Sequence, residues 1–177
     1  MLSKEELIKH YSKPFVMAAM FDNAQHKEVV GSFKGEGYGK RPDTLEYPSD
    51  ILELVKKGIT SFHVSEEIWT NPLSISPLLK RGEVDQIRLG WDLILDIDCP
   101  YWEFSKLTTY LFIEALKRHD IAAISCKFSG NKGFHIGVPF EAFPSLFKEK
   151  ETKLLFPEAP RKIARYLLNY ITENLVK

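Results

Sequence analysis

The sequence has few cysteines, and they are not arranged as metal ligands. Cys99 and Cys126 are the only two in 177 residues, and neither belongs to a CxxC pair. A disulfide framework, or a zinc site made by this chain alone, is therefore not expected. Because both thiols stand in apolar sequence, we expect both to be buried.

An excess of charge of one sign is also lacking. The chain has 24 basic and 24 acidic residues, so nothing in its net charge points to a polyanionic partner. Contact with nucleic acid would have to come from local patches. One weak candidate is the glycine-rich stretch 35–42 with its flanks, where Lys34, Lys40 and Arg41 are interleaved with Tyr38.

Long hydrophobic runs are absent too. No stretch reaches the roughly 18 apolar residues that a transmembrane helix needs, and the polar N-terminus does not resemble a signal peptide. The sequence therefore predicts a soluble cytoplasmic protein with no membrane partner. Its length and 44% hydrophobic content fit one domain, residues 1–177, that can bury a sizeable core.

Helical and strand-like patterns alternate along the chain. This mixture favours an α/β or α+β fold, with mixed sheets and flanking helices. Ser3 and Glu6 form a capping box that starts the first helix, and Ser105 is expected to cap a later one whose Leu107, Tyr110, Leu111 and Leu116 face inward. The expected helices are 3–11, 49–57, 105–118 and 160–177; the expected strands are 28–33, 60–64, 86–98, 121–128 and 134–138; and 70–82 is expected to be a loop.

The segment WDLILDIDCP, 91–100, carries the strongest chemical signal. Side chains alternate faces along a strand, so Asp96 and Asp98 share one face, with their Cβ atoms about 6–7 Å apart. Two carboxylates so close resist joint ionisation unless a cation binds them, and Mg²⁺ and Mn²⁺ prefer such oxygens. The alternative is a solvated strand end. Asp92 lies about 13 Å before Asp96 and is too far to join the same metal.

The pattern of the segment KFSGNKGFHI, 127–136, predicts a β-hairpin whose turn is Ser129-Gly130-Asn131-Lys132-Gly133. A plain hairpin accounts for the glycines, which we expect at positions that need a positive φ. The serine, the lysine, the backbone N–H groups and His135 are also donors that suit phosphates. Carboxylates for a metal beside donors for phosphates are the parts that nucleotidyl transfer requires.

Taken together, LILDID and FSGNKGFHI resemble the first two motifs of the archaeo-eukaryotic primase superfamily, and most closely those of the small, catalytic subunit of DNA primase. That family has a hydrophobic Asp-x-Asp strand followed by Ser-Gly-x-x-Gly-x-His. The segments FHVSEEIWTNPLSI, 62–75, and RLGWDLILDID, 88–98, are similar to the family's approach to its aspartate motif. The resemblance extends over 27–140 and is specific at the two motifs.

The resemblance implies an enzyme with the catalytic core of a primase, which is RRM-like, acting near the nucleoid. Asp96 and Asp98 would bind two Mg²⁺ or Mn²⁺ ions and carry catalysis. Ser129, Gly130, Lys132, Gly133 and His135 would bind the nucleoside triphosphate, and Arg41 aligns loosely with a family arginine near the nucleotide. Asn131 stands where the family often has a basic residue. DNA template and primer would be partners, as would the primase large subunit.

The sequence also departs from the family pattern. A third metal-binding aspartate is expected on a later strand, and no acidic residue after His135 stands in an apolar strand; the family's zinc-binding cysteines are missing as well. We therefore expect the N-terminal part of a longer or split subunit, completed by a second polypeptide, or a degenerate relative. Two alternatives remain open: the polymerase domain of an end-joining ligase, and a non-catalytic module that binds nucleotides or a primase partner.

Overall fold

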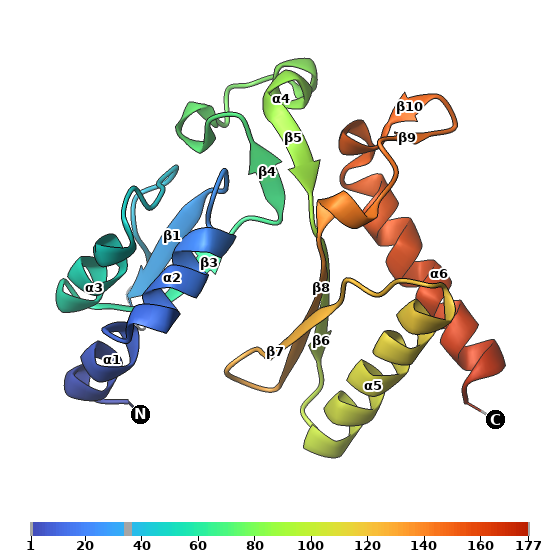
Figure 1. Cartoon of the computed structure of the whole chain (residues 1–177), viewed down its shortest axis with the longest axis horizontal. Helices are drawn as coiled ribbons and strands as arrows, with labels where there is room; N and C mark the ends of the chain where they lie inside the picture. Colours follow the sequence, from blue (N-terminus) through green and yellow to red (C-terminus); the bar gives the residue numbers. More distant parts are fainter. Residues whose placement is uncertain (1, 34–36, 177) are drawn as a thin grey trace. The chain divides into compact units, whose positions relative to one another are not determined.

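A computed structural model describes residues 2–33 and 37–176. The chain divides into two compact units, residues 1–89 and 90–177, and each is described by itself (Figure 1). Both contain helices and small sheets, so the expected mixed α/β class is confirmed. The primase-type core remains a prediction.

The first unit is built on a three-stranded antiparallel sheet of order β2-β1-β3. Alternate residues of the sheet, Val29 and Phe62 among them, pack with Ala24, Leu45 and Ile51 in a core to which α2 and α3 contribute. In chain order its elements are α1 (Lys4–Tyr11), α2 (Pro14–Asn23), β1 (Val29–Phe33), β2 (Gly37–Tyr38), α3 (Pro48–Lys56), β3 (Ile59–Val64), β4 (Glu67–Trp69), the 3₁₀ turn η1 (Pro72–Ser74) and α4 (Arg81–Ile87). Strand β4 pairs with β5 (Arg88–Trp91), which leads into the second unit.

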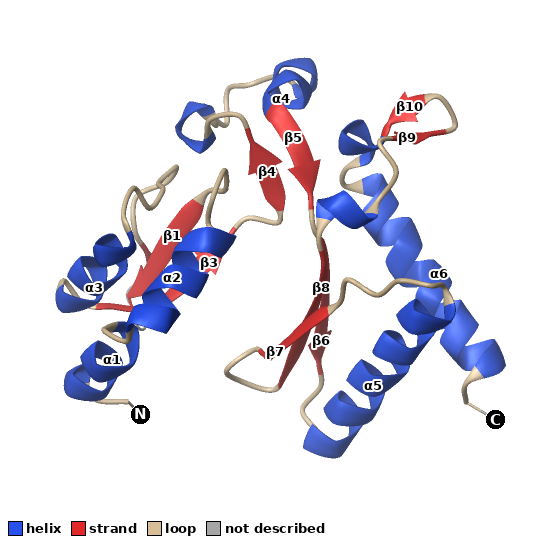
Figure 2. Ribbon diagram, in the orientation of Figure 1, coloured by secondary structure: helices blue, strands red, loops and turns tan. Residues whose placement is uncertain are grey.

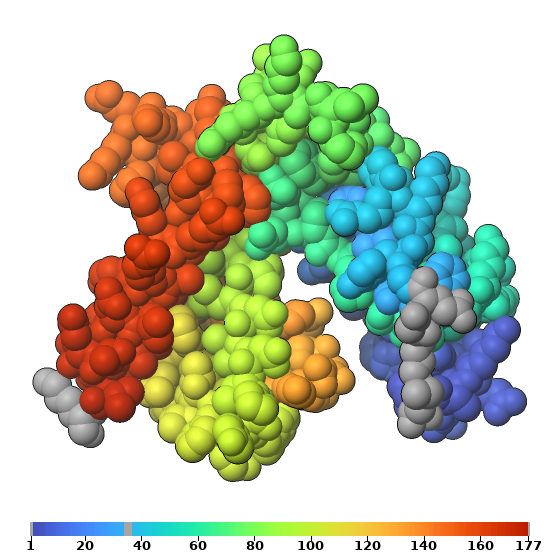
Figure 3. Space-filling view, turned by 180° about the vertical axis from the view of Figure 1, so that it is seen from behind, coloured from blue at the N-terminus to red at the C-terminus, as the bar shows by residue number. Residues whose placement is uncertain are grey.

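The second unit has a three-stranded antiparallel sheet of order β6-β8-β7, with two long helices on one face (Figure 2). Leu93 and Leu95 of β6 and Ile136 of β8 pack into one buried cluster with side chains of α5 and α6. These helices lie side by side (Figure 3). Its elements are β6 (Leu93–Asp98), α5 (Trp102–Arg118), β7 (Ser125–Phe128), β8 (Gly133–Val138), η2 (Phe140–Ala142), β9 (Leu146–Phe147), β10 (Lys150–Glu151), η3 (Thr152–Leu155) and α6 (Glu158–Asn174).

Several local predictions are confirmed. The Ser3 hydroxyl accepts a hydrogen bond from the N–H of Glu6, and the Glu6 carboxylate accepts one from the N–H of Ser3. Gly58 follows α3 with φ +109°, as expected of a glycine that ends a helix. The expected strands 28–33, 60–64 and 134–138 correspond to β1, β3 and β8.

The segment 86–98, which carries the strongest strand signal in the sequence, contains two strands rather than one. Its first two residues end α4, and the remainder forms β5 and β6 with Asp92 between them. The Asp92 side chain accepts a hydrogen bond from the backbone N–H of Phe140, 3.0 Å. The strand pairing is interrupted at Asp92, although the pattern of apolar residues continues through this position.

The helix expected from Ser105 begins three residues earlier, at Trp102. Ser105 is therefore not a cap but a fully buried residue inside α5. Leu107 and Tyr110 are 54% and 59% exposed, so their inward placement is wrong, whereas Leu116 is buried as expected. The phase of the helix was misassigned because small polar residues, Ser105 and Thr109, occupy its buried side.

Smaller corrections concern the ends of elements and the thiols. The strand expected over 121–128 forms only at Ser125–Phe128, because residues 121–124 are irregular. Cys126 is exposed on this edge strand, while Cys99 is half-buried, so the expectation of two buried thiols is wrong. In the described ranges 2–33 and 37–176, no helix has the length and apolar character needed to cross a membrane.

Candidate functional site

The register of the second sheet brings the two sequence motifs onto one surface. In β6, Asp96 pairs with His135 of β8 and Asp98 pairs with Gly133. In β7, Lys127 pairs with the other side of His135. Because side chains alternate along each strand, these residues point away from the face that packs on α5 and α6. We call this surface, which carries Asp96, Asp98, Lys127, Gly133 and His135, the carboxylate face.

Asp96 and His135 are in direct contact across the β6–β8 pair. The Nε2 atom of His135 lies 3.5 Å from Oδ1 of Asp96. The carboxylate is 65% exposed and the imidazole 32% exposed, so both can be reached from solvent. His135 is therefore not a core histidine, and it lies beside the carboxylate that the sequence assigned to a metal.

The turn between β7 and β8 is organised by Ser129. Its hydroxyl oxygen accepts hydrogen bonds from the backbone N–H groups of Asn131, 3.4 Å, and Gly133, 3.2 Å. These two N–H groups were expected to be free for a phosphate, and instead they are held by the serine. The hydroxyl proton of Ser129 and the exposed side chain of Lys132 remain as donors at this end of the sheet.

Glycine is required at the two glycine positions of the turn for different structural reasons. Gly130 has φ +91°, the left-handed conformation that was expected. Gly133 does not have a positive φ; instead, a Cβ placed on it would lie 1.6 Å from the carbonyl oxygen of Ile97. The expectation of a positive φ is therefore wrong for Gly133, which is needed because the backbones of β6 and β8 approach so closely.

The side chain of Ser105, on the buried side of α5, contacts the β7–β8 turn. Its buried hydroxyl is 2.7 Å from the carbonyl oxygen of Lys132 and 3.1 Å from that of Cys99. Those carbonyls belong to the turn and to the residue after β6. One buried side chain of α5 therefore contacts both strands at the end of the carboxylate face where Asp98 pairs with Gly133, which explains why a serine occupies the core side of this helix.

Lys127 was not among the site residues expected from the sequence. It is exposed on the edge strand and lies across from His135, on the same face as Asp96. Across β6, β8 and β7, the carboxylate of Asp96, the imidazole of His135 and the ammonium of Lys127 therefore lie in one row. The signal was present in the sequence, because Lys127 and Ser129 are two residues apart and must share a face if both lie in an extended segment.

Arg41 belongs to the first unit, and its guanidinium is paired. Its Nε and Nη2 atoms donate to the two carboxylate oxygens of Glu28, each at 2.8 Å. The hydrogen bonds and the charge of Glu28 raise the pKa of Arg41, so this side chain stays cationic. Lys34, named with Lys40 and Arg41 as a weak basic patch, lies outside the described residues.

The donor set of the carboxylate face fits a hard divalent cation. Asp96 and Asp98 supply oxygens on one face at adjacent same-side positions, which Mg²⁺ and Mn²⁺ prefer. Within residues 2–33 and 37–176, no group of three or more acidic, histidine or cysteine side chains gathers as a ready-made metal site. Two protein carboxylates would therefore leave coordination positions for water and phosphate oxygens.

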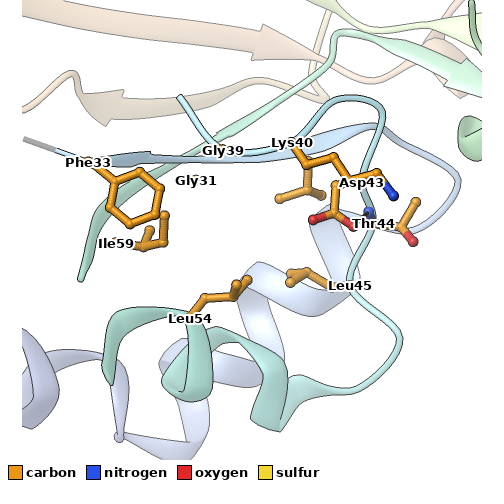
Figure 4. Close-up of a pocket in the computed structure, with 10 residues that line it drawn as sticks. Gly31, Phe33, Gly39, Lys40, Asp43, Thr44, Leu45, Leu54 and Ile59 are labelled. Carbon is orange, nitrogen blue, oxygen red and sulfur yellow. Dashed lines mark hydrogen bonds between the residues drawn. The ribbon is translucent and has the colours of Figure 1, made fainter. Parts of the chain in front are cut away.

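A cavity of about 260 Å³ lies in the first unit, between β1 and α3 (Figure 4). Gly31, Phe33 and Ile59 line one side, and Leu45 and Leu54 close the other. This lining is mostly apolar and belongs to the covered face of the sheet. Lys40 of the weak basic patch is among its lining residues, but none of the residues expected to bind metal or nucleotide lines it.

Comparison with known proteins adds no assignment. No protein-family model matches the chain, and no curated protein gives a significant match.

Proposed function

We propose that the carboxylate face is a nucleotidyl-transfer centre of the primase type, which uses nucleoside triphosphates and a DNA template. The observation that carries the proposal is the register of β6, β8 and β7. It joins Asp96 to His135 and Asp98 to Gly133, so that two motifs about thirty residues apart form one exposed surface. A solvated strand end would not require a histidine opposite one aspartate and a donor-rich turn opposite the other.

Each residue has a chemical role in this proposal. Asp96 and Asp98 would hold Mg²⁺ or Mn²⁺, which when bound lowers the barrier to attack of a 3′-hydroxyl on the α-phosphate. Lys127 of the edge strand β7 and the turn residues Ser129 and Lys132 would supply donors for the phosphate tail. The charge on the face thus runs from negative at β6 to positive at β7, which orients a polyphosphate across the strands.

His135 links the two halves of the site. Its Nε2 contacts Asp96 at 3.5 Å, a distance that is long for a hydrogen bond and easily exchanged. Once the carboxylate is engaged by a cation, His135 is available to a phosphate oxygen instead. Metal and nucleotide should therefore bind more tightly together than either does alone, because phosphate oxygens also complete the coordination of Mg²⁺.

The test uses the paramagnetism of Mn²⁺. With a nucleoside triphosphate present, Mn²⁺ should broaden the NMR signals of Asp96, Asp98 and His135, and the Asp96→Ala/Asp98→Ala variant should lose this broadening. The matched control is Glu149→Ala/Glu173→Ala, which also removes two exposed carboxylates from the second unit and should respond like the parent.

An unchanged response in the aspartate variant would contradict the proposal. Binding of Mn²⁺ and triphosphate without any transfer, even when a downstream polypeptide is supplied, would favour a non-catalytic module. Strong preference for a gapped duplex with a 5′-phosphate over a single-stranded template would favour the end-joining polymerase alternative.

A further inference from the structure

The first unit has a pocket on the face of its sheet opposite the cavity of Figure 4. Val29, Gly31 and Phe33 line that cavity, whereas the intervening Val30 lines this second pocket, because neighbouring residues of a strand point to opposite faces. The pocket measures about 290 Å³ and opens to solvent between β1, the end of β3 and the segment 38–41. The aliphatic side chain of Val30 lines it on this face, and Val64 borders it at the end of β3.

An aromatic pair forms one wall. The rings of Tyr38 and His63 meet edge to face, with centroids 5.3 Å apart and an interplanar angle of 81°. Tyr38 is nevertheless 64% exposed, so the pair is not buried by the protein itself. Exposed aromatic faces of this kind are the surfaces on which nucleobases stack in proteins that bind single strands.

A second wall is the ion pair of Arg41 and Glu28. Glu28 is 10% exposed and fixes the guanidinium plane through two hydrogen bonds, while the Arg41 side chain stays 63% exposed. The Glu28 backbone is held in turn, since its N–H donates to the Ser65 hydroxyl and its carbonyl oxygen accepts from the Ser65 N–H. The pocket therefore presents a rigid, flat guanidinium at its rim.

The charge of this wall argues against a phosphate. Arg41 and Glu28 cancel, and an oxyanion that approached the guanidinium would also approach the carboxylate. A neutral planar ring meets no such penalty. Its faces can contact Val30 and Tyr38, and its polar edge can meet the guanidinium of Arg41. The volume also lies just below the range of roughly 300–1,000 Å³ typical of ligand pockets, which suits one ring system better than a whole nucleotide.

We propose that the pocket of Val30, Tyr38, Arg41 and His63 binds a nucleobase. The base could belong to a free nucleotide or to a single-stranded nucleic acid, and the shared chemistry is a planar, neutral heterocycle stacked on Tyr38. All residues of this pocket lie in the first unit, whereas those of the carboxylate face lie in the second.

The experiment is an NMR titration of the full chain with three probes: adenosine, a short oligothymidylate and inorganic tripolyphosphate. Adenosine and the oligonucleotide should shift the methyl signals of Val30 by ring currents, and tripolyphosphate should not. The Tyr38→Ala variant should lose about 5- to 150-fold in affinity, since stacking on an aromatic side chain contributes roughly 1–3 kcal/mol per base. Tyr38→Phe, which retains the ring, should bind like the parent.

Tyr47→Ala is the matched control, because Tyr47 is also 64% exposed in the first unit but lies outside the pocket. Tighter binding of the oligonucleotide than of adenosine, weakened by salt, would identify a single strand as the source of the base. Equal affinity of the two would identify free nucleotides. Saturation by tripolyphosphate with no response to adenosine would overturn the proposal, as would unchanged affinity in Tyr38→Ala.

Discussion

Each unit of this chain has a three-stranded antiparallel sheet with one face packed and one face open. The carboxylates on the two open faces differ in their exposure and in their ion-pair partners. In the first unit Glu28 is 10% exposed and holds Arg41 through two hydrogen bonds. In the second, Asp96 is 65% exposed and has only a long contact with His135 among the described residues. The first carboxylate is already matched by a cationic side chain, and the second is open to a cation from solution.

A second pair in the first unit follows the same rule. Arg88 is buried and donates to both Glu67 and Asp85. Burial raises the pKa of Glu67, and the hydrogen bond and charge of Arg88 oppose that rise. Glu28 and Glu67 are thus largely removed from solvent and matched by arginine, which is a structural use of a carboxylate. Asp98, by contrast, is exposed and follows Asp96 on the same face.

The comparison teaches where to look for metal chemistry. A carboxylate that is buried and satisfied gains little from a cation, because its charge is already compensated. Two exposed carboxylates on one face, with no arginine of the described residues bonded to them, repel each other and gain most. The proposed metal site therefore lies in the second unit, where the carboxylates of Asp96 and Asp98 are exposed. The proposed nucleobase pocket lies in the first unit, where Arg41 neutralises the carboxylate of Glu28.

The largest expected effect is on synthesis. Nucleotidyl transfer needs both metals held closely, and two aspartates on one strand leave one side of such a cluster open. We expect this chain alone to start or extend no primer, even with Mn²⁺ and nucleotides in excess. Primer extension on denaturing gels measures this directly. Addition of a segment that carries a further strand aspartate, in cis or as a second polypeptide, should restore synthesis.

Metal-dependent primer synthesis by the purified chain, abolished by Asp96→Ala, would contradict this expectation. It would show that a carboxylate such as Glu141, which follows Pro139 and Phe140 in a 3₁₀ turn, completes the cluster. Synthesis that survives Asp96→Ala would instead place the activity on a contaminating polymerase.

The next effect is on the fold of the second unit. Gly133→Ala places a Cβ 1.6 Å from the carbonyl oxygen of Ile97, and backbone cannot rotate aside as a side chain can. We expect a loss of more than about 4 kcal/mol, or no stable β6–β8 pairing. Amide hydrogen exchange reports this strand by strand: protection should be lost in β6 and β8 and kept in β1 and β3.

Gly130→Ala is the control within the same turn. A Cβ there meets no atom within 4 Å, and only the positive φ of +91° opposes the alanine. Its cost should be about 1–2 kcal/mol, with β6 and β8 still protected. Equal protection in the parent and the Gly133→Ala variant would show that the two strands can separate without penalty, and that their close approach does not require a glycine.

The sequence predicted the parts of this arrangement that depend on local pattern. The alternation in LILDID placed Asp96 and Asp98 on one face, and the glycine-containing turn predicted the β7–β8 hairpin. It did not predict which residue of β8 would lie opposite which aspartate. That register is set by hydrogen bonds between strands distant in the sequence, and no local signal fixes it.

Charge pairing was the other feature that the sequence could not supply. Arg41 was expected beside a nucleotide from a loose alignment, and nothing in the sequence indicated that Glu28, thirteen residues earlier, would hold it. The buried role of Ser105 was hidden for a similar reason, because a serine near a helix start predicts a cap. Its partner, the carbonyl oxygen of Lys132, is brought to it only by the packing of the sheet on α5.

The smallest effect sharpens the proposed polarity of the carboxylate face. Lys127 is exposed and lies across from His135, so its ammonium should reach the outer phosphates of a bound triphosphate. Lys127→Met keeps the aliphatic stem, and we expect affinity for a Mn²⁺–triphosphate complex to fall about 1.4- to fivefold, as for exposed ion pairs worth roughly 0.2–1 kcal/mol. The loss should shrink as salt is raised, because exposed charges are screened. The loss should be smaller for the nucleoside monophosphate, which does not extend toward β7.

Lys162→Met, which changes an exposed lysine of α6, is the control for Lys127→Met. If both variants bind triphosphate like the parent in isothermal titrations, the positive end of the face lies at Lys132 alone.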